Sequence, residues 1–547
     1  MRVSILLCFV SFILSHIAFS QTSQKIYAIQ FSDKGNFYSI NNPEAFLSEK
    51  AILRRQKQGI SIKNNDLPIS PEYLQNIKNT GAKIRSASKW LNTISVEIEN
   101  ENQLNAMQQL SFVKKIEQLK SKPNSLSQNK FSDEIKPNSL PTNAMSSRAN
   151  LNYGWSDIQN YMIVVHHLHN YNYWGQGMLI AVLDAGFTNT ETHPLFNNLR
   201  NESRIVSTRN FVDGNSFVYD FSSHGTFVLS TMAADSPNEM IGTAPKASYA
   251  LFRTEDAASE YIQEEYFWAM GAELADSIGA DVINSSLGYT EFDNPNENHT
   301  YADLDGNTTP VTIAADIAAS KGILVVNSAG NAGQSNWKYV GAPADGDSVL
   351  AIGAVNAFEE IAGFSSNGPS FDGRVKPNVC AMGNNTVIAD LPTGIRTGNG
   401  TSFSGPIIAG AAAALWQAFP NKNNMEIFRA IEQSAHKYNN PDDFYGYGIP
   451  DFALASFILE GTVNVNDLNE KFQFSIYPNP NNGVFSVNNP SSKAEMSVYD
   501  NSGKLMQHLL LTEGIQQLSF KNLPKGIYIV QIKNENGIHN QKLLLQD

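Results

Sequence analysis

Cysteine is almost absent from this sequence, which holds two cysteines among 547 residues. Cys8 lies in an apolar amino-terminal segment that we expect to be removed, so Cys380 would be left without an intramolecular disulfide partner. Stability must then come from packing or from bound ions. No neighbouring motif would activate the Cys380 thiol, so a buried structural thiol is favoured over a nucleophile.

Clusters of positive charge are also absent. The formal net charge is −13 at pH 7, and no segment is rich in Lys and Arg. Nucleic acids and anionic membranes attract concentrated positive charge, so neither is an expected partner. Beyond the amino-terminal segment no run is long and apolar enough to cross a bilayer, so the sequence predicts no transmembrane segment.

The amino-terminal segment itself has the pattern of a signal peptide. Arg2 precedes the apolar run Val3–Ile17, which is followed by Ala18, Phe19 and Ser20. This run is shorter than the ~20 residues of a spanning helix. We expect cleavage before Gln21, with residues 1–20 removed and the protein leaving the cytoplasm; an amino-terminal membrane anchor is the alternative.

The rest of the chain divides by composition. Residues 21–120 mix strand and helix patterns, which predicts a small α+β unit with a helix that begins at Asn42 and runs through Arg55. Residues 121–150, rich in Ser, Asn, Pro and Lys, indicate an exposed linker. Residues 469–547 hold strand-length segments between Pro, Asn and Gly turns, which predicts a small β-sandwich.

Residues 151–460 alternate short, continuously apolar runs with helical patterns. Runs that are apolar on both faces are typical of buried parallel strands, so we expect an α/β domain with a doubly wound, mostly parallel sheet. Its active site should lie at the carboxyl ends of the strands. The predicted strands are Met178–Leu183, Asp281–Ser285, Gly322–Val326 and Val349–Val355.

Three segments of this domain carry chemically useful groups. Asp184 ends the first predicted strand, where a structural cap would be the simplest interpretation if it stood alone. His224 begins an uncharged helix, and its neutral form near pH 7 could act as a base. Ser402 comes just before the apolar helix Ile407–Phe419, where free backbone N–H groups and the helix dipole could stabilise an oxyanion.

The order Asp, His, Ser and the residues around each resemble the subtilase family. The matching motifs are His224-Gly225-Thr226 and Gly400-Thr401-Ser402 followed by Pro406, with further matches at Gly242–Pro245, Asn284–Gly288 and Ser328–Asn331. Two motifs depart from the family pattern, Asp184-Ala185-Gly186 and Lys376-Pro377-Asn378. They place the chain in a divergent branch, so no side-chain preference is carried over.

The resemblance implies a subtilisin-like serine endopeptidase that acts on protein or peptide substrates. Asp184, His224 and Ser402 would form its catalytic triad, and Asn331 would donate its side-chain amide to the oxyanion. No cofactor would be required, although subtilases often bind structural calcium. A catalytically silent surface adhesin or binding protein on the same fold is the alternative. The segment that would pair with the substrate backbone is Ser286, Leu287 and Gly288.

The two flanking units carry resemblances of their own. In position and size, residues 21–120 resemble the inhibitory prodomain of subtilases, which implies a zymogen inhibited by its own prodomain; a permanent accessory domain is the alternative. Tyr477–Pro480 and Pro524–Val530 resemble the type A sorting domain of the type IX secretion system. This implies export through the periplasm of a Gram-negative bacterium to the cell surface or the medium, with the secretion machinery as partner. A carbohydrate- or matrix-binding sandwich is the alternative.

Other titratable clusters have simpler interpretations. Three histidines near residue 166 lack ligands at metal spacing, so a non-catalytic helix face is favoured. Asp303–Asn307 lacks the full spacing of a calcium loop and indicates a solvated acidic turn. Glu264 and Glu265 are expected on a helix surface rather than as an acid/base pair. The histidines are His166, His167 and His169.

Overall fold

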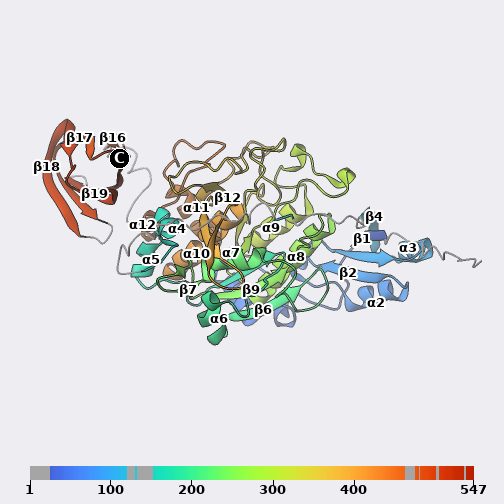
Figure 1. Cartoon of the computed structure of the whole chain (residues 1–547). Coiled ribbons are helices and arrows are strands. Elements are labelled where there is room, and N and C mark those ends of the chain that lie inside the picture. The colour runs from blue at the N-terminus through green and yellow to red at the C-terminus, as the bar shows by residue number, and fades with distance from the viewer. Residues whose placement is uncertain are drawn as a thin grey trace, which may run out of the picture.

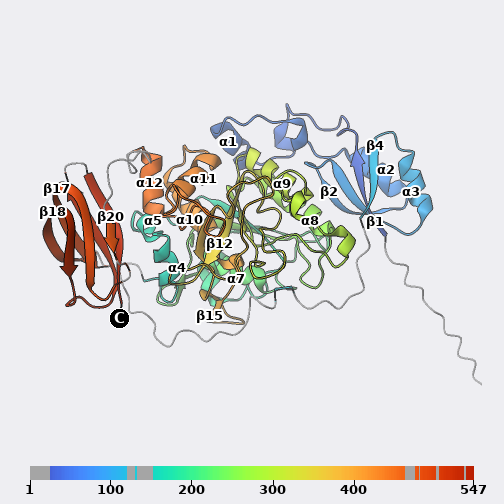
Figure 2. The same cartoon turned by 90° about the horizontal axis from the view of Figure 1, so that it is seen from above.

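The structure is a computed structural model that describes residues 25–119, 130–131, 152–461, 475–477, 479, 481–500, 504–534 and 537–546. The predicted signal peptide lies outside this range. Three bodies follow one another along the molecule: an amino-terminal unit at one end, a large central domain, and a strand-rich carboxy-terminal unit at the other end (Figures 1 and 2).

The amino-terminal unit is an antiparallel sheet of four strands in the order β2-β3-β1-β4. Helices α2 and α3 pack beside it over a core that includes Ile29, Ile94 and Met107. The predicted α+β architecture is therefore correct. The bounds are β1 Lys25–Phe31, α1 Glu49–Lys57, α2 Pro71–Asn79, β2 Lys83–Ser88, β3 Thr93–Ile98, α3 Glu101–Gln108 and β4 Val113–Leu119.

The predicted first helix begins later than expected. Pro43–Ala45 forms only a single 3₁₀ turn, and α1 starts at Glu49. The reason is local, because the Ser48 hydroxyl accepts the backbone N–H of Ala51 and so caps the helix there. In Figure 2, α1 lies over the central domain, away from the sheet of its own unit.

The central domain is built on seven parallel strands in the order β13-β12-β11-β10-β5-β9-β6, which confirms the doubly wound fold. Every residue of β5 is buried, and alternate side chains enter two different cores. This explains why the strand is continuously apolar. The bounds are β5 Leu179–Asp184, β6 Ile205–Asn210, β9 Ser248–Arg253, β10 Val282–Ser285, β11 Leu324–Ser328, β12 Val349–Val355 and β13 Val379–Met382.

Helices cover both faces of this sheet. The core on one face includes α7 and α10 to α12, and the core on the other includes α8 and α9. Cys380 is buried in the first core, as expected. The long helices are α7 His224–Ala233, α8 Gln263–Ile278, α9 Pro310–Ser320, α10 Thr401–Ala418, α11 Asn424–Gln433 and α12 Phe452–Glu460. The shorter elements are α4 Asp157–Met162, α5 His166–Asn170, α6 Asn197–Asn201, β7 Asp235–Ser236, β8 Met240–Ile241, β14 Thr386–Ala389 and β15 Ile395–Gly398.

The carboxy-terminal unit consists of antiparallel strands around a separate apolar core that includes Val487, Met496 and Val530. One ion pair, between Lys542 and Glu359, joins it to the central domain. Across the described ranges, no helix combines the length and apolar character needed to cross a membrane. The bounds are β16 Ser475–Tyr477, β17 Val484–Asp500, β18 Leu505–Ser519, β19 Gly526–Asn534 and β20 Gly537–Leu545.

Candidate active site

A buried carboxylate and a buried imidazole meet at the carboxyl edge of the sheet. Asp184 is the last residue of β5, and His224 is the first residue of α7. His224 Nδ1 lies 2.8 Å from Oδ1 and 3.0 Å from Oδ2 of Asp184, and both side chains are fully buried. An ionised carboxylate only accepts hydrogen bonds, so Nδ1 donates the proton and Nε2 is the basic nitrogen.

The start of α7 comes unusually close to the loop after β5. Gly225 donates its N–H to the carbonyl oxygen of Gly186 at 3.0 Å. A Cβ at position 225 would lie 2.5 Å from that oxygen and 2.8 Å from the Phe187 ring, so only glycine fits there. The His-Gly pair of the motif therefore has a structural cause: the glycine lets the histidine reach the aspartate.

Ser402 lies in the first turn of α10, not just before the helix as expected. The helix begins at Thr401 and runs through Pro406, which lacks the N–H that would normally bond to the carbonyl of Ser402. The Ser286 hydroxyl donates to that carbonyl at 2.9 Å instead. This replacement explains why the proline is tolerated inside the helix. Because Ser402 lies in the first turn, its backbone N–H belongs to the positively polarised start of the helix.

Asn331 follows strand β11 and faces the same helix start. Its Oδ1 accepts the backbone N–H of Thr401 at 2.8 Å and the Thr401 hydroxyl at 3.0 Å. Because the carbonyl end of the amide is held by these donors, the –NH₂ end is the one directed away from Thr401. An amide donor and a helix N-terminus thus lie side by side, an arrangement suited to a developing negative charge.

These groups line one cleft with a volume of ≈ 200 Å³. The predicted substrate-pairing segment, the predicted amide donor and the predicted nucleophile all lie on its wall. Asp184 and His224 are not among its lining residues, but Phe131, which is, stacks on the His224 ring at 4.0 Å between centroids and 18° between planes. The cleft residues that the sequence predicted are Ser286, Leu287, Gly288, Asn331 and Ser402.

Two residues of the predicted linker also line the cleft, which corrects the expectation of an exposed linker at these positions. Phe131 is 7% exposed and belongs to a core of the central domain. Lys130 enters a group of three glutamates, Glu255, Glu260 and Glu264. The polar composition of residues 121–150 gave no signal of this docking, because the acceptors for the lysine lie more than a hundred residues away in the chain.

The expected surface position of Glu264 and Glu265 is wrong. Both side chains are fully buried in the first turn of α8. The Glu265 carboxylate pairs with His299 and accepts the backbone N–H of Val311 at 3.1 Å. His299 and Val311 contact Glu265, and Lys130 contacts Glu264, so residues distant in the chain cover the start of the helix.

The remaining clusters have structural roles. The His169 ring bonds to the hydroxyl of Tyr153 at 2.6 Å and the carbonyl of Thr243 at 3.1 Å, and burial lowers its pKa to about 3. In the acidic turn, Asp303 accepts bonds from Thr300 and Asp305 from Asn307. These carboxylates bond within their own turn, and neither belongs to the group of three acidic residues that converge in the described part of the chain.

The amino-terminal unit docks on α8 through buried charges. Asp276 accepts Nη2 of Arg55 at 2.8 and 2.7 Å and also pairs with Arg54. Asp66 pairs with Lys321 at 2.9 Å across the same interface. All five side chains are at most 4% exposed, so separating the two units would leave charges without partners.

The turn between β2 and β3 docks on the same helix. The Glu273 carboxylate accepts the Ser88 hydroxyl and the backbone N–H groups of Lys89 and Trp90, the last two at 2.9 Å. The ring of Trp90 then joins the core that contains Phe131. The amino-terminal unit is therefore held beside the cleft at two places on one helix.

Comparison with known proteins assigns each body. The model of the subtilase family matches residues 175–448, that of the peptidase S8 propeptide domain of Bacteroidota matches 26–135, and that of a secretion system C-terminal sorting domain matches 475–546. The propeptide match extends past residue 120 and includes Lys130 and Phe131.

Curated relatives match the central domain. Subtilisin E of Bacillus subtilis is 34% identical over 287 residues, which is 52% of this chain and 66% of the relative. Subtilisin of Bacillus pumilus is also 34% identical over 287 residues, covering 92% of its length. The thermophilic serine proteinase of a Bacillus strain is 34% identical over 280 residues and is covered to 60%. The chain thus spans just under two thirds of the length of some of these relatives.

Proposed function

The chain belongs to the subtilase family, and from this premise we propose that it is a secreted serine endopeptidase, made as a zymogen, that hydrolyses peptide bonds through an acyl-enzyme on Ser402. One observation carries the proposal. The buried Asp184–His224 pair lies beside a cleft whose wall includes both Ser402 and the amide of Asn331. A base, a nucleophile and an oxyanion donor are then available to one substrate carbonyl.

The chemistry needs only side chains and backbone of the chain. His224 Nε2 accepts the proton of the Ser402 hydroxyl as Oγ attacks the scissile carbonyl. The carbonyl oxygen becomes an oxyanion and accepts hydrogen bonds from the Asn331 amide and the backbone N–H of Ser402. The imidazolium, stabilised by Asp184, gives its proton to the leaving amine, and water then hydrolyses the ester by the same steps in reverse order. A substrate strand would pair with the backbone of Ser286–Gly288.

The zymogen state follows from the propeptide domain and its contacts. This domain docks on α8, and Lys130 and Phe131 lie on the wall of the cleft, with Phe131 stacked on His224, so we expect them to obstruct a substrate that approaches the base. We expect the propeptide to be cut by the enzyme itself and then to act as an inhibitor. The sorting domain at the other end directs export through the periplasm to the cell surface or medium, and none of its described residues lines the cleft.

Calcium enters no step of this mechanism. Structural calcium stays a prediction from the family resemblance. A chelator should lower the unfolding temperature of the purified protein, and added calcium should restore it.

Hydrolysis of casein and of fluorogenic peptides by the purified, processed protein tests the proposal. Ser402→Ala should lower the rate by several orders of magnitude, leave the unfolding temperature nearly unchanged and accumulate as the unprocessed chain. Ser404→Ala is the matched control, because Ser404 lies on the same helix and its hydroxyl donates to the carbonyl of Thr401. An active Ser402→Ala protein would refute the triad, and a folded but inactive wild-type protein would favour the adhesin.

A further inference from the structure

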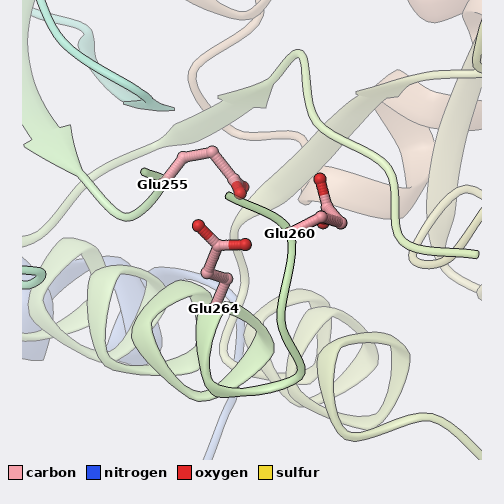
Figure 3. A group of neighbouring side chains, drawn as sticks. All are labelled: Glu255, Glu260 and Glu264. Atoms are coloured by element: carbon pink, nitrogen blue, oxygen red, sulfur yellow. The ribbon is translucent and has the colours of Figure 1, made fainter. Parts of the chain in front are cut away.

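Three carboxylates converge on the wall of the cleft. Glu255 follows β9, Glu260 lies in the next loop and Glu264 in the first turn of α8, and one oxygen of each lies within 4.8 Å of the others (Figure 3). Glu255 is 1% exposed and Glu264 is fully buried. Glu255 and Glu260 also line the cleft that holds Ser402.

Hydrogen-bond donors other than Lys130 hold two of these carboxylates, Glu255 and Glu264, in place. The Tyr289 hydroxyl donates to Glu255 at 2.8 Å, and backbone N–H groups of Asp256 and Tyr261 donate to Glu264 at 2.7 and 3.1 Å. Burial raises the pKa of Glu260 to about 8 and, together with the charge of Glu255, raises that of Glu264 well above its usual range. Such a group is stable in the ionised form only when a cation lies among its members.

The cation in this structure is the ammonium of Lys130, which arrives from outside the cluster. Its Nζ lies 2.8 Å from Glu260 and 3.3 Å from Glu264, pairs with Glu255, and donates to the carbonyl of Ser259 at 3.0 Å. The backbone N–H of Lys130 donates to the carbonyl of Ala257 at 3.2 Å. The residue is therefore bound by both its main chain and its side chain.

The next residue connects this site to the chemistry. Phe131 stacks on the imidazole of His224. Consecutive residues of an extended chain are about 3.3–3.6 Å apart, so the acidic group lies one residue along a bound peptide from the position that covers the catalytic base. A substrate that follows the same path would present one side chain to the glutamates and the next to His224.

We propose that Glu255, Glu260 and Glu264 form a subsite that binds the Lys or Arg side chain of a peptide substrate, and that Lys130 fills this subsite until the propeptide leaves. The inference rests on the proposed endopeptidase function and defines its substrate class. Preferred peptides carry a basic residue next to an aromatic or apolar one, close to the scissile bond. Loss of the propeptide removes Lys130, and the buried carboxylates then need another cation.

A panel of fluorogenic peptides tests this subsite on the processed wild-type enzyme. The peptides share one sequence and differ only by Lys, Arg, Gln or Glu at one position at a time near the scissile bond. At one position, kcat/KM should be about 10- to 100-fold higher for Lys and Arg than for Gln, the range expected for charge-assisted hydrogen bonds. Glu at that position should be the poorest substrate.

Variants assign the preference to these side chains. Glu260→Gln, at the least buried of the three positions, should reduce the Lys-to-Gln ratio at least several-fold while the Gln peptide is still cleaved. Glu291→Gln, at an exposed loop position, is the control and should keep the wild-type ratio. Because the wild-type panel needs no variant, the proposal is tested even if Glu260→Gln fails to fold.

The outcomes separate this inference from the proposed function. If no peptide is hydrolysed, or Ser402→Ala is equally active, the endopeptidase itself is refuted. If wild type cleaves the panel with equal kcat/KM for Lys, Arg and Gln at every position, only the subsite is refuted. A third outcome is that calcium ions alone stabilise the processed enzyme, that Glu260→Gln abolishes this stabilisation, and that no preference for Lys is seen. In that case the three glutamates are a metal site and the proposed subsite is wrong.

Discussion

Glu273→Gln should weaken the binding of the propeptide domain to the rest of the enzyme. In the wild type, Oε1 accepts the Ser88 hydroxyl and the N–H of Trp90, while Oε2 accepts the N–H of Lys89. Glutamine keeps the size of the side chain but has a single acceptor oxygen. The –NH₂ group of the glutamine would therefore face at least one backbone N–H that, in the wild type, donates to a carboxylate oxygen.

The size of the effect follows from these contacts. Glu273 is 7% exposed, so water does not readily replace the missing acceptor. One lost charge-assisted hydrogen bond costs about 1.5–3 kcal/mol, and a donor left without a partner costs about 1–3 kcal/mol. The two costs overlap for one bond, so we expect about 2–4 kcal/mol, which is a 30- to 1,000-fold weaker complex.

The assay is inhibition of peptide hydrolysis by the separate segment 21–135. Processed enzyme is titrated with this segment, and the inhibition constant of Glu273→Gln is compared with that of wild type. Glu291→Gln, far from the docked turn in the chain and exposed, is the control. kcat and KM for a small peptide should stay close to wild type, because Glu273 does not line the cleft. An inhibition constant within threefold of wild type would refute this account of the interface.

Three further results are expected. Asn331→Ala should lower kcat by about 100- to 1,000-fold with little change in KM. This range is known for the equivalent amide of subtilisin and is carried over by family membership. An unchanged kcat in steady-state kinetics would contradict the role of Asn331 as an oxyanion donor. Burial lowers the pKa of His166 to about 4 and of His169 to about 3, from 6.5. Below pH 6.5 the unfolded chain therefore binds a proton at each of these histidines that the folded protein does not bind. As the pH falls from 6.5 to the lowered pKa, each histidine should decrease the free energy of unfolding by about 1.4 kcal/mol per pH unit, which urea unfolding would measure. Deleting residues 469–547 should leave hydrolysis by the purified protein nearly unchanged and trap it in the periplasm; normal export with loss of surface or polysaccharide binding would favour the binding sandwich.

Local pattern predicted the parts of the fold that local physics decides. Strands β5 and β10 to β12 were predictable because both faces of each are covered, which requires continuously apolar sequence. The candidate triad was found because Asp184 ends a buried strand and because His224 and Ser402 stand beside glycines and a proline in recognisable motifs. The family match confirms the resemblance to subtilases, whereas the roles of individual residues stay predictions for mutagenesis.

Helix boundaries were less predictable where a distant partner decides them. Pro406 would normally end or delay a helix, yet α10 begins at Thr401 because the hydroxyl of Ser286, 116 residues away, bonds to the carbonyl that the proline leaves open. No window of neighbouring residues contains that information.

The sequence alone therefore determined the class of fold, the order of the three bodies and the residues proposed for catalysis, since each has a local signature in apolar period, turn residues or motif. Only the tertiary structure decided that Glu264 is buried, that it converges with Glu255 and Glu260, and that Lys130 lies among them. The physical reason is that a charged residue is hydrophilic in any local pattern, and it can be buried only when its counter-charges arrive from elsewhere. Here they arrive from segments 125 and 134 residues apart, which only the folded chain brings together.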